Sequence, residues 1–259
     1  MNMLGALLAI VLVGAPGFAA AQPASAGAAD AKLIEDLVAA NRVLAMEGVL
    51  DGYGHVSVRH DKDPDRYLMA RSVAPQLVAA ADIMEFDLDS SPVDQRGRAM
   101  YNERFIHGEI YKARPDVKVV VHNHSPSLIP FGVSGVPLRP MYHMSAFIGF
   151  GVPVFEIRAS GGMTDMLVRN AALGRGLARA LGNHPAVLMR GHGAAVVGPS
   201  MPLAVGRSIY LEMNARLQTQ AAALGGNITF LDAEEVRLVE ARQDYRRAWD
   251  DWRAKAGVR

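Results

Sequence analysis

The segment 117–124 has valine at every second position, which is the pattern of a β-strand, and it ends with two histidines. Side chains alternate between the faces of a strand, so His122 and His124 should point to the same side. A third histidine, His192, lies between Gly191 and Gly193, where the backbone can turn sharply and approach a neighbour closely. Three neutral imidazoles with one open position form the ligand set of a catalytic zinc-type site. The sequence therefore predicts a fold that gathers these histidines around one metal ion.

Composition limits the number of domains, the kinds of partner and the kinds of metal ligand that this chain can have. The chain has 259 residues, is 50% hydrophobic and carries a formal charge of +1, which fits one sizeable domain with a single core. Basic residues are scattered among acidic ones, so we expect no nucleic-acid partner. The chain has no cysteine, which excludes disulfides, thiolate ligands and cysteine nucleophiles. The metal site must therefore use nitrogen and oxygen ligands only.

The N-terminal segment has the character of an export signal. The first charged side chain is Asp30, and the apolar run before it is too short to span a bilayer but matches a secretory core followed by an A-x-A cleavage site before Gln22. We expect a signal peptide at 1–21, a disordered leader at 22–31, one domain at 32–259, a periplasmic or secreted protein and no stable membrane anchor. The opening MNM carries no Lys or Arg, so the alternatives are an unprocessed alanine-rich leader or a misassigned start, which would leave the protein in the cytoplasm.

Hydrophobic periodicity and capping residues outline the elements of the domain. Helices are expected at 30–48, 103–113, 164–182, 200–224 and 232–252. Strands are expected at 54–60, 67–72, 83–89 and 117–124 and in both arms of 186–198, the first of them half-buried. Strands and helices interleave with few regular strand–helix–strand units. The order predicts an α/β layered domain with a largely antiparallel sheet.

The spacing of an acidic residue and the histidines resembles the class II aldolase/adducin superfamily. Glu103 lies four residues before His107 and nineteen before His122, and H-x-H and R-G-H-G follow. The resemblance implies a three-layer fold with a central antiparallel sheet flanked by helices, and often a homotetramer with active sites between subunits. It implies one divalent metal ion per subunit, with zinc favoured over manganese, iron or cobalt. Its ligands would be His122, His124 and His192, with Glu103 as the acid/base beside the metal.

The resemblance suggests further site residues. His143 falls near the position where sugar-phosphate aldolases of the family place a catalytic tyrosine, and Tyr142 is its neighbour, so both are candidate catalytic residues. His55 stands where relatives usually carry an asparagine that helps to bind substrate. His107, one helical turn beyond Glu103, could orient that carboxylate or simply pack in the helix.

Two departures from the sugar-phosphate members bear on the substrate. Their T-P-S-G-like turn is replaced by ARSVAP, and their serine pair by Tyr101 and Asn102, so the phosphate cradle is lost. Arg71 and Arg104 stand nearby and could bind a substrate carboxylate, or they could be solvated surface charges. The segment from Glu103 onward most resembles a decarboxylase-like branch that includes 2-hydroxy-3-carboxymuconate semialdehyde decarboxylase and dihydroxyphthalate decarboxylase.

These observations favour a metal-dependent carbon–carbon lyase. The leading interpretation is decarboxylation of a small, non-phosphorylated hydroxy or oxo carboxylic acid through a metal-stabilised enolate. A class II aldolase or epimerase acting on a sugar or sugar phosphate is the first alternative. The others are a non-catalytic adducin-like interaction module and an iron site that activates dioxygen.

Overall fold

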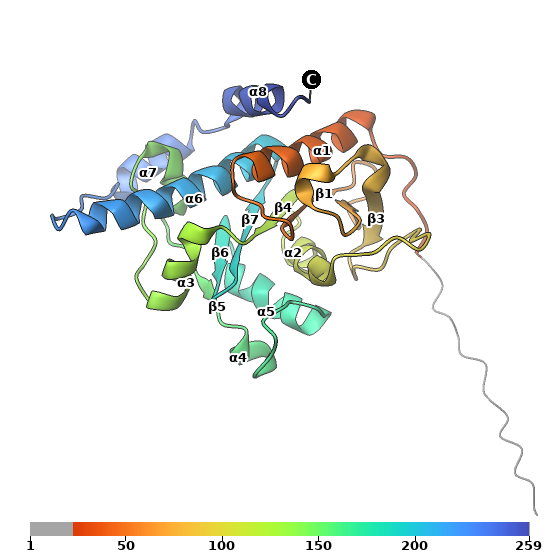
Figure 1. The fold of residues 1–259 in the computed structure, drawn as a ribbon, viewed down its shortest axis with the longest axis horizontal. Coiled ribbons are helices and arrows are strands. Elements are labelled where there is room, and N and C mark those ends of the chain that lie inside the picture. The colour runs from red at the N-terminus through yellow and green to blue at the C-terminus, as the bar shows by residue number, and fades with distance from the viewer. Residues whose placement is uncertain (1–22, 259) are drawn as a thin grey trace, which may run out of the picture.

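The computed structural model describes residues 23–258, so the predicted signal peptide lies outside the described residues (Figure 1). The strands are β1 (His55–Arg59), β2 (Arg66–Ala70), β3 (Ile83–Asp87), β4 (Val119–Asn123), β5 (Val154–Phe155), β6 (Ala186–Met189) and β7 (Gly193–Gly198). The helices are α1 (Ala31–Met46), α2 (Phe105–Ala113), α3 (Ile129–Ser134), α4 (Arg158–Gly161), α5 (Ala171–Leu181), α6 (Met201–Ala223), α7 (Ala233–Glu240) and α8 (Arg246–Lys255).

Within this part of the chain the strands form one seven-stranded sheet in the order β3-β2-β1-β4-β7-β6-β5. Neighbouring strands are antiparallel except β5 and β6, which are parallel. Helices cover both faces, which gives three layers. The predicted α/β fold with a largely antiparallel central sheet is confirmed.

The two hydrophobic layers use alternate residues of the same strands. On one face α1, α6 and α8 pack on Val56, Val121 and Val196. On the other face α2 and α5 pack on Val120 and Val197. Every residue of β1 is buried, so the prediction of a half-buried strand was wrong. Its alternating pattern reflects two covered faces, one apolar and one whose polar side chains form hydrogen bonds to α2.

Two predicted helices differ from the structure. The helix expected from Thr164 begins only at Ala171, because Asn170 caps it by accepting from the amide of Leu173, whereas the Thr164 hydroxyl accepts from the amide of Met166 within a local turn. The helix expected over 232–252 is split into α7 and α8.

The break between α7 and α8 ends at Tyr245, which has a left-handed backbone with φ 55°. Its ring packs where Gly206 of α6 leaves room, and its hydroxyl donates to the carbonyl of Met144 at 2.6 Å. Drawing this side chain into the core requires the chain to bend, which periodicity alone does not reveal.

Residues 23–30 form no helix or strand but follow the edge of the sheet. The hydroxyl of Ser25 and the amide of Ala26 donate to the carboxylate of Glu85 on β3, at 2.6 and 2.7 Å. The guanidinium of Arg66 on β2 donates to the carbonyl of Ala24 at 3.0 Å. Among residues 23–258, no helix combines the length and the apolar character that a membrane crossing needs.

Candidate metal site

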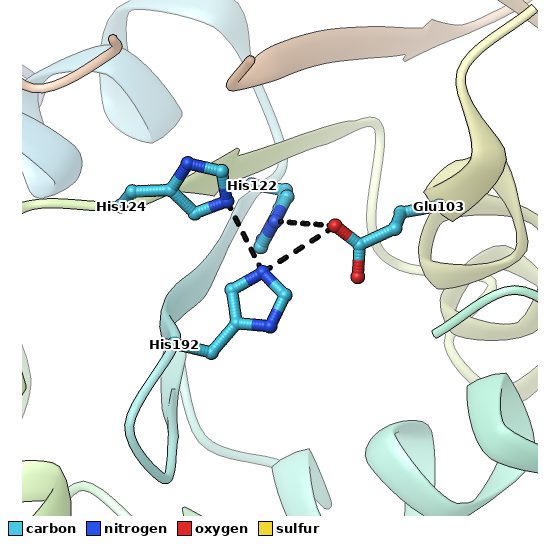
Figure 2. Close-up of side chains that lie close together, drawn as sticks. All are labelled: Glu103, His122, His124 and His192. Carbon is cyan, nitrogen blue, oxygen red and sulfur yellow. Dashed lines mark hydrogen bonds and ion pairs between the residues drawn. The ribbon is translucent and has the colours of Figure 1, made fainter. Parts of the chain in front are cut away.

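Four side chains from three parts of the chain converge on one point (Figure 2). Glu103, His122, His124 and His192 each offer one ligand atom, and these atoms lie within 4.8 Å of one another. The Nε2 atoms of His124 and His192 are 3.1 Å apart, and Oε2 of Glu103 lies 3.4 Å from Nε2 of His122 and 3.3 Å from Nε2 of His192. The geometry brings together the three histidines and the acidic residue that the sequence predicted.

The β4–β7 pairing explains how histidines so far apart in the sequence meet. His122 lies in β4, His124 follows its end, and His192 occupies the turn between β6 and β7. A Cβ atom on Gly193 would lie 1.9 Å from the carbonyl oxygen of Asn123, so only glycine allows the strands to approach this closely. The turn thereby holds His192 against the end of β4.

Backbone carbonyls set the orientation of two imidazoles. Nδ1 of His122 lies 3.1 Å from the carbonyl oxygen of Ala194, and Nδ1 of His192 lies 3.0 Å from that of Met166. A carbonyl oxygen can only accept, so each Nδ1 carries the hydrogen and each Nε2 presents a lone pair to the centre. This is the tautomer that a metal ligand requires.

A carboxylate orients the third imidazole. Nδ1 of His124 lies 3.0 Å from Oδ2 of Asp51, and Oδ1 of Asp51 accepts from the amides of Tyr53 and Gly54. The turn after α1 thereby holds Asp51 so that His124 also presents Nε2 as a lone pair. A carboxylate behind a metal-binding histidine raises the basicity of the ring and fixes its orientation.

The donor set fits a divalent metal ion. Nε2 of His122 is fully buried and has no hydrogen-bond partner among residues 23–258, although a buried polar atom normally has one. Three lone pairs and a carboxylate within 4.8 Å also need a cation to offset their mutual repulsion. Imidazole nitrogens with one carboxylate oxygen suit zinc and also iron, manganese or cobalt, so the cluster could hold any of these ions.

Glu103 is buried and held at both oxygens. Oε1 accepts from the amide of Val168 at 2.8 Å, while Oε2 faces His122 and His192. Burial is the largest single influence and raises the pKa of this carboxyl. The charge and hydrogen-bond contributions of the two histidines together lower the pKa by more than burial raises it, so the net pKa lies below the ordinary range. Glu103 is therefore a carboxylate at neutral pH. It lies in the 3₁₀ turn Asn102–Arg104, just before α2, and not in the helix predicted to start there.

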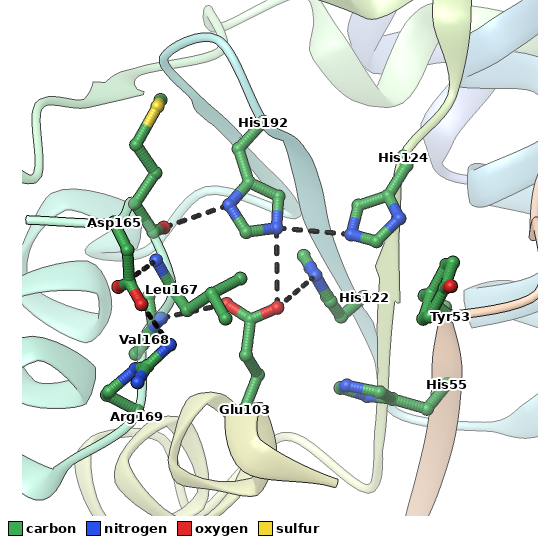
Figure 3. Close-up of polar contacts among 12 residues, drawn as sticks. Tyr53, His55, Glu103, His122, His124, Asp165, Leu167, Val168, Arg169 and His192 are labelled. Carbon is green, nitrogen blue, oxygen red and sulfur yellow. Dashed lines mark hydrogen bonds and ion pairs between the residues drawn. The ribbon is translucent and has the colours of Figure 1, made fainter. Parts of the chain in front are cut away.

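A second group of buried polar side chains lies next to the cluster, and Figure 3 shows its first member, His55, near His122. Nδ1 of His55 is 2.7 Å from Nε2 of His107, whose Nδ1 is 2.5 Å from the hydroxyl of Ser57. His107 therefore bonds to these β1 side chains and does not bond to Glu103. Of the two roles expected for His107, the structure shows it packed in the interior and not orienting the carboxylate. The ring of His55 lies 5.1 Å from that of His122.

The structure does not bring the other predicted residues into this cluster. Tyr142 and His143 lie at the start of the 3₁₀ segment His143–Ile148, beside α6, and the hydroxyl of Tyr142 donates to Sδ of Met213 at 3.0 Å.

The two predicted carboxylate-binding arginines have partners elsewhere. Nε of Arg71 is 2.7 Å from Oδ1 of Asp82. The guanidinium of Arg104 donates to the carbonyls of Ser90 and Tyr101, at 2.9 and 3.1 Å.

Three contributors to the site were missed by sequence reasoning. Asp51 lies in the run DGYG, where an acidic residue among glycines could have been noticed as part of a turn near the site. Met166 and Val168 contribute backbone groups, and the expectation of a helix over 164–182 concealed them. A continuous helix would use these amide and carbonyl groups for its own hydrogen bonds, whereas the observed turn leaves them free for His192 and Glu103.

Residues 35–219 match the family model described as class II aldolase and adducin N-terminal domain. The chain is 37% identical over 244 residues to the decarboxylase tropJ of Talaromyces stipitatus, which covers 85% of this chain and 92% of that protein. It is 34% identical over 221 residues to the 3,4-dihydroxyphthalate decarboxylase of Terrabacter sp., covering 81% and 88%. Its fold is similar to that of L-fuculose 1-phosphate aldolase from Glaciozyma antarctica, with a TM-score of 0.72 and 24% identity over 87% and 90% of the two chains. The chain therefore belongs to the class II aldolase/adducin superfamily, in its decarboxylase-like branch.

Proposed function

We propose that this protein is a metal-dependent carbon–carbon lyase that decarboxylates a small, non-phosphorylated hydroxy or oxo carboxylic acid. The observation that carries the proposal is the convergence of three Nε2 lone pairs and the Glu103 carboxylate on one point. The similarity to tropJ and to 3,4-dihydroxyphthalate decarboxylase supports decarboxylation over aldol cleavage.

His122, His124 and His192 would hold the metal through Nε2. When bound, a divalent ion would act as a Lewis acid that stabilises negative charge on a substrate oxygen, which lowers the barrier by several kcal/mol, and about 1.4 kcal/mol is a factor of ten in rate. The backbone partners of His122 and His192 keep their rings in place without a side chain that could rotate away. The site is therefore organised before substrate arrives.

Glu103 is the group placed to move a proton. It enters the reaction as a carboxylate, so the proton that it returns to carbon after loss of carbon dioxide must first come from a substrate hydroxyl or from solvent. The amide of Val168 holds Oε1 and leaves Oε2 on the side of the histidines. This arrangement directs the proton-carrying oxygen toward the position of the reacting atoms.

The test combines metal content with product analysis. Purified protein is stripped with a chelator, reloaded with zinc, manganese or iron, and assayed for carbon dioxide release from 3,4-dihydroxyphthalate and other hydroxy or oxo acids. We expect turnover to vanish on stripping and to return with one of the metals. Cleavage of L-fuculose 1-phosphate in preference to every acid would overturn the proposal in favour of an aldolase.

Two variants separate metal binding from proton transfer. His122→Ala should lose bound metal, whereas Glu103→Gln should keep the fold and much of the metal while turnover falls by about 100-fold or more. His184→Ala is the matched control, because Nδ1 of His184 bonds to the carbonyl of Gly151 outside the cluster. Near-normal turnover of Glu103→Gln would remove this carboxylate from the mechanism.

A further inference from the structure

A row of buried polar side chains runs from the metal site into the layer between the sheet and α2. It begins with the contacts from Nδ1 of His55 to Nε2 of His107 and from Nδ1 of His107 to the hydroxyl of Ser57. It continues over 2.8 Å to the hydroxyl of Tyr111, which lies 3.3 Å from the carbonyl oxygen of Lys118. The four side chains are at most 2% exposed, so water does not complete their hydrogen bonds.

The ends of this row define the direction of its hydrogen bonds. Both rings are buried and neither has a carboxylate as a hydrogen-bond partner, so a charge on either ring would be costly. With both rings neutral, the row holds four hydrogens for four contacts. The carbonyl of Lys118 can only accept. If every group donates toward Lys118, all four contacts are filled, whereas the opposite direction fills three and leaves the carbonyl contact without a hydrogen. The first arrangement is therefore favoured.

This direction determines which nitrogen of His55 carries the hydrogen. Nδ1 donates to His107, and Nε2 is left as a bare lone pair. Nε2 has no hydrogen-bond partner among the described residues, and the side chain is only 2% exposed. The β1–β4 register pairs His55 with His122, and Figure 3 shows the ring of His55 near that of His122. His55 therefore offers a hydrogen-bond acceptor beside the metal cluster.

We propose that Nε2 of His55 accepts a hydrogen bond from a substrate hydroxyl group, and that His107, Ser57 and Tyr111 are positioning residues that fix the required tautomer. The inference rests on the proposed function and narrows its substrate to a carboxylic acid with a hydroxyl group beside the reacting carboxylate. An acceptor at this point disfavours a carboxylate or phosphate oxygen there, because neither brings a hydrogen.

The tautomer can be read without substrate or turnover. Protein loaded with zinc and labelled with ¹⁵N in its histidine rings is examined by NMR, and His55 is assigned from the signals lost in His55→Leu. We expect Nδ1 of His55 to be protonated and Nε2 unprotonated. A protonated Nε2 in the unmodified protein would overturn the inference whether or not the enzyme is a decarboxylase.

Substitution of Tyr111 tests the role of the row. In Tyr111→Phe the remaining groups can donate in either direction and fill the same number of contacts, so the signals of His55 should shift toward a mixture of tautomers. Tyr67→Phe is the matched control, because Tyr67 is also buried and its ring lies 5.5 Å from that of Tyr111, but its hydroxyl donates to the carbonyl of Arg104. An unchanged His55 spectrum in Tyr111→Phe would show that the row does not set the tautomer.

Binding of two simple acids tests the acceptor itself. Calorimetry on the zinc-loaded protein compares 2-hydroxybenzoate with benzoate, and we expect the hydroxylated acid to bind about tenfold more tightly or better. In His55→Leu most of this preference should disappear while the affinity for benzoate is kept. A preference that survives in His55→Leu would assign hydroxyl recognition to another group and sink the proposal. Failure of carbon dioxide release alone would contradict the proposed function and leave these two results standing.

Discussion

Each histidine of the cluster has its Nδ1 hydrogen committed to a different acceptor. Two acceptors are the backbone carbonyls of Ala194 and Met166, and the third is the carboxylate of Asp51. Asp51 is therefore the one member of this group that a point substitution can remove without touching a predicted metal ligand. Substitution of Asp51 therefore removes the group that orients His124 and leaves all three imidazoles in place.

Asp51→Ala should weaken metal binding by about tenfold, the lower end of the range for such partners, because the Asp51 side chain is 49% exposed and water can partly replace it. The measurement is competition for zinc against a chelator of known affinity. Asp89→Ala is a suitable control, since Asp89 pairs with Lys112 on α2 outside the cluster. Unchanged zinc affinity in Asp51→Ala would mean that the orientation of His124 is set without this carboxylate.

Two short elements decide how the site is assembled. The β6–β7 turn presents His192 because Gly193 allows β7 to lie directly against the end of β4. The non-helical segment before α5 then supplies the backbone partners of His192 and Glu103 through Met166 and Val168. In both elements the contribution to the site comes from the backbone: the missing side chain of Gly193 in the first, and a carbonyl and an amide group in the second.

Gly193→Ala should separate β7 from β4 at the site. A methyl group there meets the carbonyl of Asn123 at 1.9 Å, so the backbone must shift, at a cost of about 1–3 kcal/mol in the free energy of unfolding. Chemical denaturation measures this loss, and the metal content should fall with it. Gly226→Ala, where a Cβ meets no atom within 4 Å, should change neither quantity. If Gly193→Ala retained full stability and metal, the close approach would not be essential.

At the scale of the whole molecule, buried histidines link stability to pH in the metal-free protein. The folded-state pKa of His107 is about 3, against 6.5 for the exposed group. Below pH 6.5 the unfolded chain binds a proton that the folded chain excludes, so stability falls as the pH drops, by up to about 1.4 kcal/mol per pH unit for this residue. Denaturation of the metal-free protein from pH 6.5 to 5 should show this slope, and His107→Gln should reduce it by about one proton. An equal slope in both proteins would contradict the assignment.

The separation of Tyr142 and His143 from the cluster bears on assembly. Both lie beside α6 within one chain, so a catalytic role for either requires a second subunit. We propose the homotetramer with active sites between subunits that the family resemblance implies. Light scattering on the purified protein should give four times the chain mass. A fully active monomer would contradict the assembly and any catalytic role for these two residues.

Export is a separate proposal that depends on residues 1–21. We expect the mature protein to begin at Gln22 and to be found in the periplasm or medium of its host. N-terminal sequencing of protein from fractionated cells measures both properties. Recovery of protein with an intact Met1 from the cytoplasm would contradict export.

The residues proposed to hold the metal could be predicted from the sequence because they depend on local rules. Strand alternation places His122 and His124 on one face, glycine flanks His192, and the spacing of Glu103 carries the family resemblance. The sheet and most helix starts follow from similar short-range patterns, such as the aspartate cap of α1 at Asp30.

What the tertiary structure alone decided are the contacts between residues far apart in the chain. The partner of His124 is 73 residues away at Asp51, and the acceptor for His192 is the carbonyl of Met166, 26 residues away. Both faces of β1 are buried because helices cover both, and the helix expected over 232–252 is interrupted before Tyr245, whose side chain packs in the core. The hydrogen-bond row behind His55 likewise joins β1 to α2. Such contacts depend on how elements pack, which no pattern within a single element specifies.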